Sequence, residues 1–424
     1  MNSDNDPHSP TSEEPGSDSP VDAPRETPAG EDTEDEAAAK SAVAEEPKEK
    51  KAPEWTLERI AVERQRLDLA LVVIVLLIVV FLASFPAANS ELWRHLATGR
   101  LVAARAFEFG SDPYTATTNG VRWVDHSWLF DLKLYELARV FGGPESLAGG
   151  AALIIAKMML VVILAWVLMS IQRSGQGWWA PASTTLLALL AMTPQLQLGP
   201  GIVSLLFLGI TLYFLTRPEP ATPPIGLLAR ALSSTPLCLF VVCAMWVNMD
   251  RWFILGPVTV ALFWLGETIQ AQVAPIRTGP EAPPPDHNRR LLFALGAGLL
   301  GCLLNPYHVN AFALPRELAF YLSSSPLKGD PAFDKLLFSP LQAEYLRNQS
   351  LGLNVAGMAY LPLILLGVIS FVITRGIGWR WWRVLLWAGF FIPSVMLATF
   401  VPYFAVVAAP ITALNLQDYG VAHF

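Results

Sequence analysis

A short polar segment between two apolar stretches carries the first residues that could perform acid–base chemistry. In ANSELWRHLATGR, Glu91, His95 and Thr98 stand at positions i, i+4 and i+7, so they share one face of a helix. Asn89 or Ser90 can cap that helix, which puts Glu91 in its first turn, where the helix dipole favours a carboxylate. A carboxylate and an imidazole on one face are the groups that a general base needs.

A second polar group follows in WVDHSWLFDLKLYELARVFGG. Asp125 and His126 stand at the start of an expected helix that Gly142 and Gly143 end. Its mixture of aromatic and aliphatic residues with spaced charges is typical of a helix lying in the membrane interface. Each of these residues also has a purely structural interpretation, as a helix cap or as the partner of a neighbouring charge.

The elements that must position these residues are membrane helices. The chain has 424 residues, of which 53% are hydrophobic and 15% charged, against roughly 25% charged in soluble domains. Because about 20 apolar residues span a bilayer core, we expect an all-α polytopic protein with about ten transmembrane helices. They are expected at 67–87, 147–171, 178–193, 201–215, 232–247, 252–271, 291–304, 356–374, 384–399 and 404–416. The three cysteines lie in apolar runs, and no spacing fits a zinc or iron–sulfur site.

The N-terminal segment differs from the rest of the chain. Residues 1–50 hold 15 acidic and 4 basic residues, and almost no large apolar residue. We therefore expect residues 1–52 to be a disordered acidic tail ahead of a multi-pass domain at 53–424. The tail is either a solvated extension or a docking segment for a protein partner. It lacks the basic start and apolar core of a signal peptide.

Basic residues in short loops predict the orientation. Arg173, Arg230 and Arg380 are among those that fall on one side, with the N-terminus, which places both termini in the cytoplasm. Two long loops, at about 88–146 and 305–354, then face outward. Further polar residues at the same outer ends are Asn248, Asp250, Arg251, Asn305, Tyr307, His308 and Arg316. The orientation therefore predicts one site that faces outward. We do not expect nucleic acid to be a ligand of this site.

The block ELWRHLATGRLV, SDPYT and WVDHSWLFDLKLYELARVFGG, with WVNMDRWFILGP and LLNPYHV later, resembles a known family. It is similar to bacterial multi-pass proteins of the C-type (GT-C) glycosyltransferase superfamily, such as protein mannosyltransferases and lipid A glycosyltransferases. The resemblance covers roughly residues 67–320. It implies a helix bundle with two juxtamembrane helices in the first outer loop, located in the bacterial cytoplasmic (inner) membrane.

The resemblance also implies a reaction, in which a sugar moves from a polyprenyl phosphate to an acceptor at the outer face. The family's acidic motif, commonly Asp-x-Asp, corresponds here to Asn89-Ser90-Glu91. Glu91 would then be the base, oriented by His95, with Asp125 as a second carboxylate. The groups expected to hold sugar or phosphate are His126, Arg251, His308 and Arg316. A divalent cation is the one cofactor implied, and the loss of one acid weakens that role.

Two other classes of function stay open. A non-catalytic membrane subunit, or a degenerate relative, fits the altered acidic motif and the acidic tail. A transporter or flippase of lipid-linked solutes needs charges inside the spans, and Lys157 is the one residue that meets this condition. No internal repeat supports the transporter.

Overall fold

The computed structural model describes residues 57–85, 90–114, 122–218, 225–273, 286–312, 339–348 and 352–423. The chain divides into two units, Met1–Thr56 and Leu57–Phe424. The acidic tail expected at 1–52 and the candidate residue Arg316 both lie outside the described residues.

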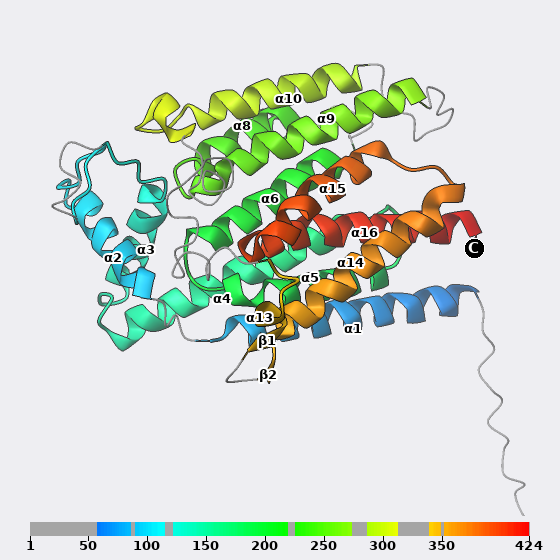
Figure 1. Ribbon diagram of the computed structural model, residues 1–424, viewed down its shortest axis with the longest axis horizontal. Coiled ribbons are helices and arrows are strands. Elements are labelled where there is room, and N and C mark those ends of the chain that lie inside the picture. Colours follow the sequence, from blue (N-terminus) through cyan, green and yellow to red (C-terminus); the bar gives the residue numbers. More distant parts are fainter. Residues whose placement is uncertain are drawn as a thin grey trace, which may run out of the picture. The chain divides into compact units, whose positions relative to one another are not determined.

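The described part of the second unit is almost wholly helical (Figure 1). Each of the ten apolar ranges expected from the sequence overlaps a helix. Its α-helices are α1 Leu57–Ala83, α2 Ser90–Ala103, α3 Trp128–Val140, α4 Leu147–Ser170, α5 Trp179–Met192, α6 Pro200–Thr216, α7 Leu227–Ser233, α8 Thr235–Trp246, α9 Leu255–Val273, α10 His287–Cys302, α13 Ala343–Leu346, α14 Val355–Ile373, α15 Trp381–Met396 and α16 Val401–His423. Short 3₁₀ turns are η2 Thr193–Gln195, η3 Arg251–Ile254, η4 His308–Phe312, η5 Thr374–Gly376 and η6 Ala398–Phe400.

Five stretches of the described chain are long and apolar enough to cross a membrane. They are Arg59–Ala83, Leu147–Ser170, Arg251–Val273, Val355–Gly376 and Ala398–His423. The pair α7 and α8, bent by 79°, would make a sixth span if it crosses as one. The shorter helices α6 and α15 are apolar but fall below that length. The count of about ten crossings therefore stays a prediction.

Helix α16 lies at the centre of the bundle. Its residues from Val401 to Leu414 are all buried, and it packs against α5, α6, α14 and α15. Continuous burial explains why this helix is apolar on every side, whereas the outer helix α1 exposes large apolar side chains such as Leu77 and Phe81. Those exposed side chains on α1 are what a lipid-facing helix presents.

The second long loop contains structure that the sequence did not indicate. After α13, the strands β1 (Arg347–Asn348) and β2 (Gly352–Leu353) pair antiparallel, with Arg347 opposite Leu353. The Asn354 side chain then caps α14 by accepting from the backbone N–H of Ala356 at 3.1 Å.

Helices α2 and α3 form a pair beside one end of the bundle, as expected for juxtamembrane helices (Figure 1). Gly99 of α2 allows the close approach, because a Cβ atom there would overlap the backbone carbonyl of Asp131. Gly142 and Gly143, both with positive φ, end the segment that follows α3. Ser146 then caps α4, accepting from the N–H of Gly149 at 2.9 Å, so that α3 leads directly into the long bundle helix α4.

Candidate functional site

The start of α3 is fixed to the ends of two bundle helices. The indole N–H of Trp128 donates to Asn248 Oδ1 at 3.0 Å, and the N–H of Leu129 donates to the Asn248 carbonyl at 3.1 Å. The Asn248 amide in turn donates to the carbonyls of Ala244 and Leu304. One side chain thus joins α3, α8 and α10, which brings the first and second long loops to the same end, as the sequence predicts.

A buried histidine–aspartate pair joins α2 to α3. His95 Nδ1 lies 2.6 Å from Asp131 Oδ1, and the two side chains are 2% and 0% exposed. The imidazole also meets the edge of the Phe130 ring, at 5.8 Å between ring centroids. His95 Nε2 is buried and has no hydrogen-bond partner among the described residues.

Burial sets the protonation of this pair. It raises the pKa of Asp131 to about 9, with the nearby carboxylate of Asp125 adding to the shift. It lowers the pKa of His95 to about 4. Near neutral pH one proton therefore lies between Oδ1 and Nδ1, and a second is on His95 Nε2, which is an N–H donor. The carboxylates near enough to oppose the shift of His95 are Glu91, Asp125 and Asp250.

Asp125 lies next to this pair. Its Oδ1 accepts from the backbone N–H of Ser127 at 3.0 Å and from the Ser127 hydroxyl at 2.8 Å. The same hydroxyl lies 3.4 Å from Asp131 Oδ2, so Ser127 connects the two acids. Asp125 Oδ2 is buried and has no partner among the described residues. Helix α3 begins at Trp128, three residues after Asp125, because this side chain holds the turn that precedes the helix.

A third acid comes from the turn after α8. Asp250 Oδ2 accepts a hydrogen bond from the Ser204 hydroxyl of α6, which itself accepts from the Trp246 indole N–H at 2.6 Å. Burial raises the pKa of Asp250, and the Ser204 hydrogen bond and the Arg251 charge oppose that shift. Asp250 was noted from the sequence only as an outer-end residue, and the structure gives it a buried place beside the histidines.

His126 is held from two sides. Its Nε2–H donates to the Ala311 carbonyl at 2.8 Å, and its ring stacks on Phe253 at 6.0 Å between centroids. Burial lowers the pKa of His126. The charges of Asp125, Asp250 and Arg251 are all close enough to act on it. With Nε2 carrying the proton, Nδ1 is left as an acceptor.

The remaining sequence candidates lie at the edge of this cluster. Glu91 is exposed in the first turn of α2. His308 is also exposed, in the turn that follows α10, and has a left-handed backbone (φ 49°) that is unusual for a residue other than glycine. Tyr307 beside it is buried, which raises its pKa to about 12. The structure therefore brings together Glu91, His95, Asp125, His126 and Arg251, with His308 at the same end of the bundle.

The described residues do not fit a bound divalent cation. They contain no group of three or more His, Cys, Asp or Glu side chains arranged as metal ligands. Asp131, which lies near Asp125, shares a proton with His95. It is therefore not available as a charged carboxylate that could bind a cation.

Asp131 is the residue that sequence reasoning missed. On α3 it shares one face with Leu134 and Ala138, three and seven positions later, and all three are buried. An acid within the apolar face of an amphipathic helix is costly to bury without a partner. That position was the available signal, because the hydrophobic pattern alone places Asp131 on the buried side.

Comparisons with known proteins bear on the fold. No protein-family model and no curated protein matches the sequence. Among solved structures, the chain is similar to the archaeal oligosaccharyltransferase AglB from Archaeoglobus fulgidus, in complex with an inhibitory peptide and a dolichol-phosphate (TM-score 0.54, 11% identity). That match covers 84% of this chain and 50% of the other.

A crystal structure of the Archaeoglobus fulgidus oligosaccharyltransferase tethered to an acceptor peptide with an NVT sequon is also similar (TM-score 0.50, 14% identity, 83% of this chain and 49% of the other). The chain thus spans about half the length of these relatives. At such low identity the likeness shows the fold alone, which this chain shares with the matched part of these oligosaccharyltransferases.

Proposed function

We propose that this protein moves a sugar from a polyprenyl-phosphate donor to an acceptor at the outer membrane face. The observation that carries the proposal is that two buried polar atoms near α2 and α3, His95 Nε2 and Asp125 Oδ2, have no hydrogen-bond partner within the described part of the chain. Buried polar atoms without partners are rare in proteins and are explained when a ligand supplies the missing hydrogen bonds. One atom is a donor and the other an acceptor, which matches a phosphate oxygen and a hydroxyl.

The charges suggest a role for each group. Asp125 Oδ2 accepts the proton of the acceptor hydroxyl as that oxygen bonds to the sugar carbon and the sugar–phosphate bond breaks. The His95 Nε2–H donates to the departing phosphate, and Arg251 balances its negative charge. His126, fixed through Nε2, offers Nδ1 to a sugar hydroxyl. Glu91 is the alternative base, and His308 and Arg316 are further candidates for phosphate binding.

The similar solved structures support this proposal, since one of them holds a dolichol-phosphate and the other an acceptor peptide. A lipid-linked donor is consistent with α4, a helix apolar enough to span a membrane that packs against α3. The bacterial inner membrane and the cytoplasmic location of both termini belong to the same proposal.

Reconstitution of the full chain in vesicles with a panel of labelled polyprenyl-phosphate sugars tests it, by measuring the release or transfer of sugar. We expect Asp125→Asn and His95→Gln to lower the rate by at least about 100-fold, as for the loss of general acid–base groups. Glu91→Gln decides which carboxylate is the base. Glu136→Gln is the matched control, because Glu136 is an exposed acid of α3 paired with Lys133, and it should keep the wild-type rate.

The same experiment separates the proposal from the non-catalytic alternative. If wild-type protein that elutes as a folded species releases no sugar from any donor of the panel, the enzyme proposal fails. The chain would then be a membrane subunit with a degenerate site. If Asp125→Asn and Glu91→Gln both keep full activity, the site assignment fails while the reaction class stands.

A further inference from the structure

Two of the three cysteines meet across the contact between α8 and α10. Cys243 lies one turn before the end of α8, and Cys302 is the last residue of α10. Both are free thiols in the structure, both are fully buried, and the thiol of Cys302 interacts with that of Cys243. Cys238, five residues earlier on α8, instead directs its thiol to the backbone carbonyls of Ala231 and Leu232. The pairing of Cys243 with Cys302 is therefore selective.

Glycines of α10 bring the two helices close together at this level. A Cβ atom on Gly301 would overlap the carbonyl oxygen of Phe240 and would lie 3.3 Å from Cys243 Cβ. A Cβ atom on Gly298 would lie 3.3 Å from Cys243 Sγ. Because Gly298 and Cys302 are four positions apart, they share the face of α10 that packs on Cys243. A disulfide requires two backbones that lie this close together.

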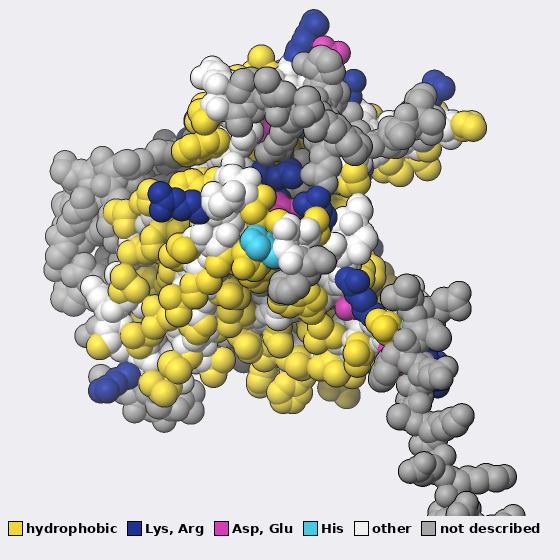
Figure 2. Space-filling view, turned by 90° about the vertical axis from the view of Figure 1, so that its right-hand side faces the viewer, with side chains coloured by type: hydrophobic (Ala, Val, Ile, Leu, Met, Phe, Trp, Pro, Cys, Tyr) yellow, Lys and Arg dark blue, Asp and Glu magenta, His cyan; other side chains and the backbone are white. Residues whose placement is uncertain are grey.

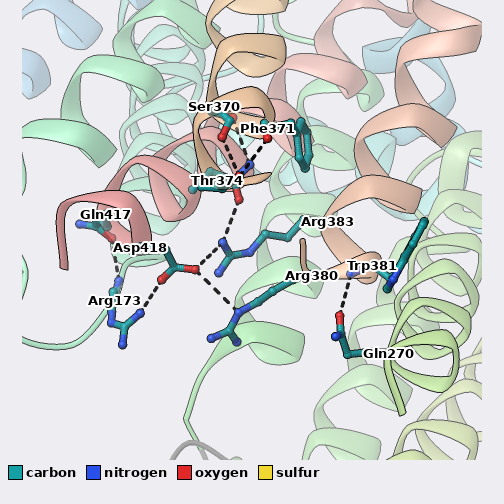
Figure 3. Close-up of polar contacts among 11 residues, drawn as sticks. Arg173, Gln270, Ser370, Phe371, Thr374, Arg380, Trp381, Arg383, Gln417 and Asp418 are labelled. Carbon is teal, nitrogen blue, oxygen red and sulfur yellow. Dashed lines mark hydrogen bonds and ion pairs between the residues drawn. The ribbon is translucent and has the colours of Figure 1, made fainter. Parts of the chain in front are cut away.

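No ion pair can strengthen this contact, because α8 contains no charged residue. Other parts of the bundle are joined through charge. Asp418 of α16 accepts hydrogen bonds from Arg173, which follows α4, and from Arg383 of α15 (Figure 3). A polar link between α8 and α10 lies beyond the helix ends, where the Asn248 amide donates to the Leu304 carbonyl at 2.7 Å. A covalent bond between the two thiols would join the helices themselves.

The thiol pair lies at the ends of α8 and α10 that hold the candidate site. The Asn305 amide donates to the Cys302 carbonyl at 2.8 Å, and Asn305 Oδ1 accepts from the backbone N–H of Tyr307 at 2.8 Å. The same turn leads to Ala311, whose carbonyl accepts from His126. In the proposed orientation this end of the bundle is outside the cytoplasm, where the redox conditions favour disulfides.

Once the helices have packed, the pair is shielded from reagents dissolved in water. Both thiols are fully buried, and the outer faces of α8 and α10 expose apolar residues such as Val241 and Leu300. Figure 2 shows hydrophobic side chains over much of the face that it presents, as expected for a bundle surrounded by lipid. Buried thiols react slowly. A bond between them would therefore form before α8 and α10 pack, and would resist reduction afterwards.

We propose that Cys243 and Cys302 form a disulfide while the helices assemble, with a disulfide-bearing thiol oxidase of the outer compartment as the oxidant. The thiolate of Cys302 attacks a sulfur of the oxidant's disulfide and forms a mixed disulfide, from which the thiolate of Cys243 displaces the oxidant. The two cysteines lose two electrons and two protons, and the disulfide of the oxidant becomes two thiols. This inference rests on the proposed orientation and not on the transferase activity.

Counting the free thiols of the full-length protein tests this. Bacterial cells that make the protein are quenched in acid, and the denatured protein is labelled with a polyethylene-glycol maleimide, which adds one mass step for each free thiol. We expect the wild type to show one step, from Cys238, and three steps after reduction. Mass spectrometry should identify one joined pair of peptides, containing Cys243 and Cys302, that has lost two hydrogens.

Serine variants assign the bond. Cys302→Ser should show two steps with and without reduction, because Cys238 and Cys243 then both stay free. Cys238→Ser is the matched control on the same helix, and should show no step before reduction and two after it. We also expect Cys302→Ser to lower the melting temperature in detergent more than Cys238→Ser does, because only the first variant loses the cross-link.

Three steps in the unreduced wild type would overturn the proposal and leave the two cysteines as packing residues. A joined peptide that contains Cys238, or a single step in unreduced Cys302→Ser, would show that the cysteines pair without selection, which also contradicts it. The labelling of a cysteine introduced at Ser111 measures the orientation separately, so a failure of the orientation is distinguishable from a failure of the disulfide.

Discussion

At the scale of single residues, the pair formed by His95 and Asp131 is the clearest departure from what the sequence indicates. The sequence contains both residues, but 36 positions separate them. No local pattern predicts which acid pairs with which imidazole. The sequence assigned His95 to Glu91 on the same helix. The structure gives it Asp131 on the neighbouring helix, because the buried face of α2 packs on the buried face of α3.

The protonation of Asp131 makes stability depend on pH. Its pKa, raised to about 9 by burial, means that the folded state keeps a proton that the unfolded chain loses above about pH 4. The stability from this group is complete below that pH and is lost as the pH rises towards 9. Between pH 4 and 6.5 the lowered pKa of His95 has the opposite effect, so the net loss is expected between pH 6.5 and 9.

We therefore expect the melting temperature of the wild-type protein to fall from pH 6.5 to pH 9, with a slope of at most one proton, or about 1.4 kcal/mol per pH unit. Asp131→Asn should flatten this fall, because the amide does not titrate. Glu136→Gln, an exposed acid of the same helix, should keep the wild-type profile. A melting temperature that is equally pH-dependent in Asp131→Asn and wild type would contradict the assignment.

At the scale of elements, the helices α2 and α3 were predictable and their contact was not. Capping residues, periodicity and the Gly142-Gly143 stop located α2 and α3 to within a few residues. The close approach depends on Gly99, which in the sequence has no feature that sets it apart from a glycine in any helix. Only the packed backbone of Asp131 shows that a side chain is excluded there.

Gly99→Ala should therefore separate α2 from α3. The added methyl group overlaps the Asp131 backbone and contacts Tyr135 Cβ, so we expect a loss of about 1–3 kcal/mol of stability. The displacement should also lengthen the hydrogen bond between His95 and Asp131 and lower the transfer rate. Thermal unfolding in detergent and the vesicle transfer assay measure the two effects.

Gly150→Ala provides the control for that substitution. Gly150 is also a helical glycine, in α4, but a Cβ atom there meets nothing within 4 Å. Alanine at this position should leave stability unchanged or raise it by up to about 1 kcal/mol. Similar losses in Gly99→Ala and Gly150→Ala would mean that helix flexibility, and not the α2–α3 contact, explains the effect.

At the scale of the whole molecule, hydropathy located the helices but did not settle how many cross the membrane. Every expected apolar range overlaps a helix. Five stretches of the described chain are long and apolar enough to span a membrane. Helices such as α5 and α10 have only 14 and 16 residues, and the central α16 is apolar because protein surrounds it. Composition alone does not separate burial in protein from burial in lipid, since both environments favour the same residues.

The predicted orientation can be tested with one cysteine at each end of the bundle. Ser111, between α2 and α3, and Ser174, between α4 and α5, are both exposed. The natural cysteines Cys238, Cys243 and Cys302 are buried, so a membrane-impermeant maleimide should label the wild-type protein little. In intact cells we expect Ser111→Cys to be labelled and Ser174→Cys to react only after permeabilisation, because α4 crosses between them and the arginines near Ser174 stay inside. The reverse pattern would place the proposed transfer site on the cytoplasmic side. Labelling of both from outside would show that α4 does not cross the membrane.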